Sequence, residues 1–106
     1  MPAASTAPQV PALPEGVRRL VASLGAEPSV LRVVLFGSRA RGDAEQRSDV
    51  DLAVEAPSLS GREWLRLLDM AEAADTLLSI DLVRLEEAPE ELRARIASEG
   101  RTLHER

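Results

Sequence analysis

Residues 37–54 read GSRARGDAEQRSDVDLAV and join a glycine-bounded polar turn to a segment that carries acids. The turn directly follows residues 30–36, a short apolar run rich in β-branched side chains that is typical of a buried strand. From residue 49 to residue 55, acidic or small residues alternate with valine and leucine, which is the period-two pattern of a strand. The sequence therefore predicts two strands joined by a polar, glycine-bearing connection.

Three aspartates are the candidate catalytic residues. Asp49 and Asp51 are two positions apart, so a strand places both carboxylates on one face, with backbones about 6.6 Å apart. Asp81 is the one acid in the apolar run 80–85, which predicts a third strand. Clustered carboxylates repel one another and need a positive counterpart, either arginine or hard cations such as Mg²⁺. Taken alone, the spacing of Asp49 and Asp51 is more typical of a solvated strand face than of a site.

The turn between the first two strands supplies phosphate-binding chemistry. Gly37 and Ser38 offer backbone N–H groups and a hydroxyl, and Arg39 and Arg41 offer guanidinium groups. The glycine spacing matches that of a P-loop, but Asp43 stands where a P-loop requires lysine, so a P-loop is excluded. A plain hairpin turn would explain the glycines alone. Next to the aspartates, the segment instead indicates a phosphate site.

Helical periodicity surrounds these strands. Ser60 and Glu63 have the spacing of a capping box, and the apolar stripe behind them contains Trp64, so we expect that side chain to face the core or a partner. Helices are predicted over residues 15–25, 60–78 and 89–100. This order of elements predicts an α/β (α+β) domain with a small mixed sheet of about three to four strands and helices packed on it.

The composition excludes several classes of protein. The chain has 106 residues, a net charge of −5 and no cysteine, so disulfides, thiolate metal sites and thiol catalysis are absent. The excess of acids argues against strong nucleic-acid binding. No apolar run is long enough for a membrane span, and no secretory signal is visible, so we expect a cytoplasmic protein.

Some segments are expected to have no part in the chemistry. Residues 1–14 contain four prolines among small side chains and predict a flexible tail, which leaves residues 15–106 as the domain. His104 is expected to be exposed in a frayed C-terminal segment. In the last helix, Glu91 and Arg95 are four positions apart and predict an ion pair on a solvated face.

Together, residues 37–54 resemble the signature of the minimal nucleotidyltransferase (MNT) family of the DNA polymerase beta superfamily. The segment SIDLVRL with the third acid, the helix with the tryptophan and the closing IASEGRTLHER are also similar to that family, so the resemblance spans residues 15–106. It implies a polymerase beta-like nucleotidyltransferase fold. The expected reaction is transfer of a nucleoside monophosphate, most simply AMP from ATP, with pyrophosphate as the leaving group.

The resemblance also implies roles for individual residues. Gly37 and Ser38 would hold the triphosphate, and Asp49 and Asp51 would ligate two Mg²⁺ ions. Asp81 would complete one metal site and help to deprotonate the attacking hydroxyl. Our electrostatic argument adds that the two guanidinium groups of the turn neutralise phosphate charge.

Members of this size are similar to the antitoxin half of HEPN–MNT toxin–antitoxin pairs, in which a tyrosine of a helical RNase toxin is modified. The chain has no tyrosine, so it cannot label itself on that side chain. We therefore expect a HEPN-like partner that receives AMP, and a hetero-oligomer remains open. Two alternatives also remain open: an antitoxin that neutralises its toxin by covering it, and an adenylyltransferase that acts on a small molecule.

Overall fold

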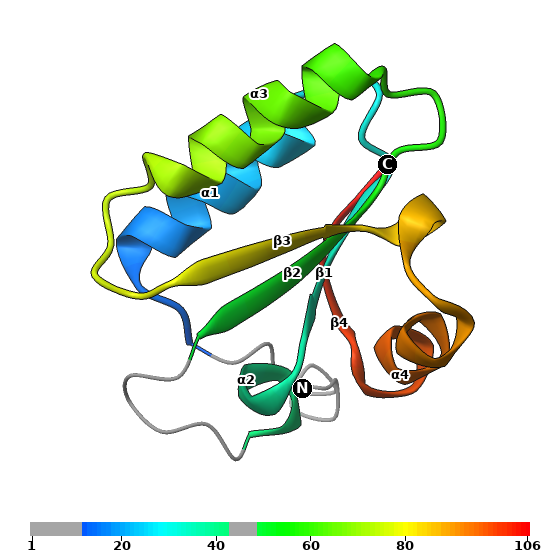
Figure 1. The fold of residues 1–106 in the computed structure, drawn as a ribbon. Helices are drawn as coiled ribbons and strands as arrows, with labels where there is room; N and C mark the ends of the chain where they lie inside the picture. Colours follow the sequence, from blue (N-terminus) through cyan, green and yellow to red (C-terminus); the bar gives the residue numbers. More distant parts are fainter. Residues whose placement is uncertain (1–11, 43–48) are drawn as a thin grey trace, which may run out of the picture.

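The computed structural model describes residues 12–42 and 49–106 (Figure 1). Their strands form one four-stranded mixed sheet. The strand order is β3-β2-β1-β4. β1 pairs in antiparallel fashion with both β2 and β4, whereas β2 and β3 are parallel. The strands are β1 (Arg32–Phe36), β2 (Val50–Glu55), β3 (Ile80–Arg84) and β4 (Arg101–Glu105).

Helices cover the two faces of the sheet unequally (Figure 1). α1 and α3 lie side by side over one face, α4 lies against the other, and α2 lies at the end of the sheet where β1 ends. A 3₁₀ turn, η2 (Leu85–Glu87), connects β3 to α4. The helices are α1 (Glu15–Gly25), α2 (Ser38–Arg41), α3 (Gly61–Glu72) and α4 (Glu90–Glu99). The predicted fold class is confirmed.

The period-two alternation of the strands divides the core into two clusters. The larger cluster lies under α1 and α3 and includes Leu35 of β1 and Leu52 of β2, both of which are completely buried. The smaller cluster lies under α4 and joins Phe36 of β1 and Ala53 of β2 to Ile96. Successive residues of one strand therefore serve opposite faces.

The capping box at the start of α3 is confirmed. Glu63 N–H donates to the Ser60 hydroxyl at 3.1 Å, and Ser60 N–H donates to the Glu63 carboxylate at 2.9 Å. The predicted length of this helix is wrong, because α3 ends at Glu72. Leu78 fits the helical spacing and packs against the larger cluster, but it does so from the loop before β3.

β4 corrects the prediction of a frayed C-terminal segment. Its register against β1 shifts between Val33 and Val34, which pair with His104 and Thr102, so Leu103 is the extra residue of a β-bulge. The bulge turns both Leu103 and His104 towards α1, where the imidazole lies against the end of the helix, and the histidine is half-buried rather than exposed.

Two expectations from the sequence concern residues outside the described ranges. Residues 1–11 of the expected tail lie outside them, as does Asp43, which served to exclude a P-loop. Within residues 12–42 and 49–106, no helix has the length and apolarity to cross a membrane.

Candidate active site

The candidate acids lie together at the end of the sheet where β2 and β3 begin. Asp51 and Asp81 are register partners on these two parallel strands, so their side chains share one face. Asp49 immediately precedes β2 and is two positions from Asp51. Asp51 is half-buried beside β1, where it pairs with Phe36, whereas Asp49 and Asp81 are exposed. The strand register therefore brings together the acids that the sequence singled out.

The glycine at the end of β1 lies directly against one of these carboxylates. Gly37 has φ 78° and ψ −158°, a backbone conformation that is almost restricted to glycine. A Cβ atom at this position would lie 2.3 Å from Oδ2 of Asp51, far inside van der Waals contact. The residue must therefore be glycine for two reasons, and the turn and the acid are parts of one site.

The segment after Gly37 is a single helical turn, α2, and not the plain hairpin that the sequence analysis weighed. Ala40 N–H and Arg41 N–H both donate to the Gly37 carbonyl at 3.1 Å. Ser38 begins the turn, and Gly42 ends it with φ 87°. This tight turn holds the predicted phosphate-binding residues within four positions of each other, next to Asp51.

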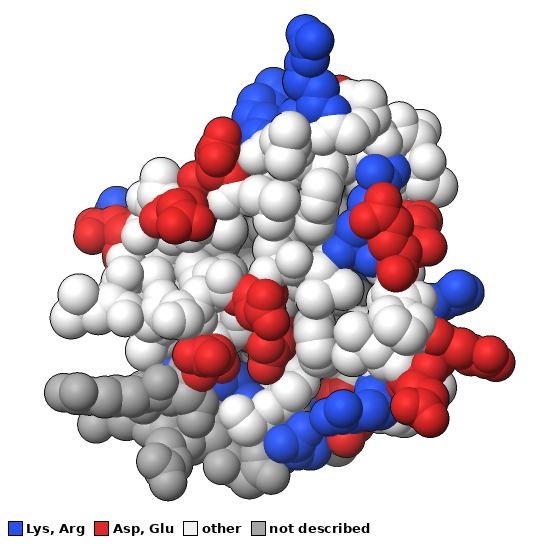
Figure 2. All heavy atoms as spheres, viewed as in Figure 1, with Lys and Arg blue, Asp and Glu red and all other residues white. Residues whose placement is uncertain are grey.

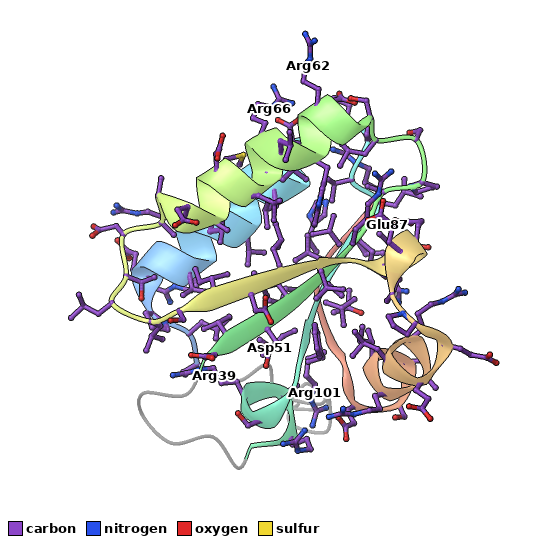
Figure 3. All side chains as sticks on the ribbon, viewed as in Figure 1. Arg39, Asp51, Arg62, Arg66, Glu87 and Arg101 are labelled. Carbon is purple, nitrogen blue, oxygen red and sulfur yellow. The ribbon has the colours of Figure 1, made fainter. Side chains whose placement is uncertain are left out.

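Residues from the distant C-terminal part of the chain hold α2 in place. Arg41 Nη1 lies 3.4 Å from a carboxylate oxygen of Glu99 at the end of α4, and Arg101 Nε donates to the Ala40 carbonyl at 3.3 Å. In Figure 3, Arg101 and Arg39 lie on either side of α2, at the end of the sheet to which Asp51 belongs. Neither Glu99 nor Arg101 is recognisable as a site residue from the sequence, because only the pairing of β4 with β1 brings them to this site.

The electrostatics of the site are dominated by its acids. Burial raises the pKa of Asp51 above its ordinary value of 3.8, and the negative charges of Asp81 and Asp49 raise this pKa further. The positive charges of Arg41 and Arg95 oppose that effect only in part. Figure 2 shows acidic side chains gathered near the middle of this face and a band of basic ones below them.

This donor set fits a divalent cation by its chemistry. Carboxylate oxygens are the ligands that Mg²⁺ prefers, and a cation would relieve the repulsion that raises the pKa of Asp51. As they stand, no three Asp, Glu, His or Cys side chains within the described ranges are arranged to hold a metal ion. The acids therefore offer suitable ligands without forming a closed metal cage.

Comparison with protein families gives one match, which covers most of the chain. Residues 19–106 match the family model described as "Polymerase beta, Nucleotidyltransferase". The match includes the turn, all three candidate aspartates and the bulged strand β4. Among curated proteins, none matches this sequence significantly.

Several solved structures share the fold. A minimal nucleotidyltransferase is 30% identical, with 82% of this chain and 89% of that chain covered and a TM-score of 0.62. A toxin–antitoxin structure with AMP-PNP is 28% identical over 87% of this chain and 73% of that chain, with a TM-score of 0.65. A third structure holds a tri-AMPylated Shewanella oneidensis HEPN toxin in complex with an MNT antitoxin. It is 26% identical, with 87% of this chain and 69% of that chain covered and a TM-score of 0.58.

Proposed function

Because this chain belongs to the polymerase beta nucleotidyltransferase family, we propose that it transfers AMP from ATP to a hydroxyl of a HEPN-like toxin and thereby acts as an antitoxin. One arrangement of residues carries the proposal. The Gly37 backbone lies against the Asp51 carboxylate, and Asp81 is the register partner of Asp51. This arrangement supports a phosphate-binding turn placed next to a metal-binding group of acids.

In the proposed mechanism, Asp49, Asp51 and Asp81 would hold two Mg²⁺ ions, which would supply charge neutralisation for the transferred phosphoryl group. Asp51, half-buried between β1 and β3, has little freedom to move and orients the site. Asp81 is exposed on the edge strand of the sheet, where an acceptor from another protein can approach it. This exposure supports the proposal that Asp81 takes the proton of the attacking hydroxyl.

The remaining roles concern phosphate binding. Gly37 and Ser38 hold the triphosphate through backbone N–H groups and the serine hydroxyl, while Arg39 and Arg41 neutralise its charge. The acceptor oxygen forms a bond to the α-phosphorus, and the bond from that phosphorus to the bridging oxygen of the β-phosphate breaks, so pyrophosphate leaves. No covalent enzyme intermediate is required, and the catalysis consists of positioning and charge neutralisation.

The partner is proposed from the relatives and from the composition. Solved structures with this fold include toxin–antitoxin pairs, and in one of them the HEPN toxin is tri-AMPylated. These 106 residues contain no tyrosine, so a tyrosine acceptor must lie outside this sequence. We propose that this acceptor is a tyrosine of a HEPN-like protein.

The test uses the whole chain mixed with ATP, Mg²⁺ and HEPN-like proteins of the same source, followed by mass spectrometry of the partner. We expect the partner to gain one or more AMP groups. The double variant Asp49→Asn/Asp51→Asn should still bind the partner but should add no AMP. Asp69→Asn, an exposed acid on α3, is the matched control and should transfer normally.

The same experiment separates the alternatives. If the double variant neutralises the toxin as well as the unmodified chain does, the protein works by covering its partner and the proposed chemistry is wrong. If the chain consumes ATP with an aminoglycoside and leaves every protein partner unmodified, the acceptor is a small molecule.

A further inference from the structure

One stripe of α4 faces the end of the sheet that holds the candidate acids. Glu99 belongs to this stripe, because its carboxylate reaches Arg41 of α2. Arg95 is four residues earlier in the same helix, so the helical repeat places it on the same stripe, one turn away. α4 therefore presents two charged residues in succession along the side that approaches α2.

The packing of α4 fixes where this stripe lies over the sheet. Ile96, the neighbour of Arg95, is buried in the smaller core cluster with Phe36 and Ala53. Phe36 is the register partner of Asp51, and Ala53 is the next residue of β2 on the same face. The strand positions beneath this turn of α4 are thus the immediate neighbours of Asp51.

Arg95 is exposed, and its guanidinium makes no hydrogen bond or ion pair with any residue in the ranges 12–42 and 49–106. The ion pair with Glu91 that the sequence predicts does not form there. Arg95 differs in this respect from Arg41, whose guanidinium is engaged with Glu99.

We propose that Arg95 is a polyphosphate-binding residue of the nucleotide site, contributed by the side of α4 that approaches α2. This inference rests on the proposed function and extends it from the signature segment to the C-terminal helix. A guanidinium group forms two parallel hydrogen bonds to phosphate oxygens, and an arginine without a competing ion pair does so without first breaking one. The ligand chemistry is that of the β- and γ-phosphates of a nucleoside triphosphate.

The proposal predicts which ligands depend on Arg95. A nucleoside triphosphate and inorganic triphosphate both carry the phosphates that the guanidinium would contact, whereas AMP does not. Loss of the side chain should therefore weaken the binding of triphosphates selectively. Loss of a residue that merely stabilised α4 would weaken the binding of all ligands alike.

The experiment is calorimetry of the full chain with Mg²⁺ and, in turn, ATP, inorganic triphosphate and AMP. For Arg95→Ala, we expect the Kd of ATP and of triphosphate to rise about tenfold, as for loss of a charged hydrogen bond, and the Kd of AMP to stay within about twofold. Arg95→Lys should recover part of the affinity for ATP. Arg93→Ala, which removes an exposed arginine lining the groove between α4 and the far part of the sheet, is the matched control and should bind all three ligands normally.

The outcomes are distinguishable. Unchanged affinity of Arg95→Ala for ATP, when the unmodified chain binds ATP, overturns the inference and leaves the proposed function intact. An equal loss for ATP and AMP also overturns it, because the effect would then be structural. If the unmodified chain binds no nucleotide in the presence of Mg²⁺, the proposed function fails and this inference fails with it. Equal melting temperatures of Arg95→Ala and Arg93→Ala show that both variants are folded.

Discussion

The two faces of the sheet serve different purposes. The face under α1 and α3 buries the larger apolar cluster, which includes Leu35 and Leu52. The face under α4 buries only a small cluster and carries Asp51 and Asp81 at one end. Adjacent residues of β2 thus have different roles, because period-two alternation points one side chain into the core and the next towards the site. Stability and chemistry can therefore be altered separately along a single strand.

The α4 face also carries charge at the other end of the sheet. Arg32 and Glu55 are cross-strand partners there, with Nε and a carboxylate oxygen 3.0 Å apart. A groove of about 1060 Å³ lies between this end of the sheet and α4, so the helix covers the face incompletely. The α4 face is thus polar at both ends and apolar only in the middle.

The strongest test of this division is Leu52→Ala. Leu52 is completely buried next to Asp51 in sequence, and its truncation should cost about 2–5 kcal/mol of unfolding free energy. Val83→Ala, on the α4 face of β3 and half-buried, should cost roughly 1 kcal/mol. Urea denaturation measures both, and similar losses for the two variants would contradict the comparison.

A smaller effect, on AMP transfer, is expected for Gly37→Ala. This substitution lies where the turn after β1 meets the α4 face of the sheet. The added methyl group would displace the Asp51 carboxylate, and we expect AMP transfer to fall about a hundredfold, as for other losses of fixed geometry at an active site. Gly42→Ala is the control, because Gly42 also has a positive φ but has no neighbour within 4 Å, and its left-handed helical backbone accepts alanine more readily than that of Gly37 does. Equal loss of activity in both variants would show that displacement of the Asp51 carboxylate is not the cause.

The smallest effect concerns the stability of Asp51→Asn without metal. The folded-state pKa of Asp51 is raised, so the folded chain holds this proton more tightly than the unfolded chain does. Ionised Asp51 therefore destabilises the fold at neutral pH, and Asp51→Asn should melt at a slightly higher temperature. The advantage should shrink as the pH falls through the raised pKa and should vanish below 3.8. Melting curves of the two proteins from pH 7 downwards measure it, and a lower melting temperature of the variant at pH 7 would contradict this argument.

The strands and their shared acidic face follow from local patterns. Alternation placed Asp49 and Asp51 on one face, and the lone acid in an apolar run marked Asp81 as worth explaining. What sequence periodicity does not determine is which strands pair. The adjacency of Asp51 and Asp81 depends on the parallel pairing of β2 with β3, which is a tertiary property.

The features that the sequence analysis missed have specific physical causes. α2 has four residues, too few for a helical repeat to be visible. β4 is rich in polar residues, and its pairing with β1 defines it as a strand. The predicted ion pair of Arg95 failed because helical spacing permits such a pair without requiring it.

The bulge at Leu103 also sets the phase of the last residues of the chain. Arg106 follows it and donates from its guanidinium to the carbonyls of Val30, Gly25 and Glu27, at 2.8, 2.9 and 2.8 Å. If β4 kept Leu103 but paired regularly, with Leu103 opposite Val33, every side chain after Leu103 would emerge on the reverse side of the strand. The hydrogen bonds of Arg106 to the loop between α1 and β1 would then be lost, so a change in β4 would alter that loop.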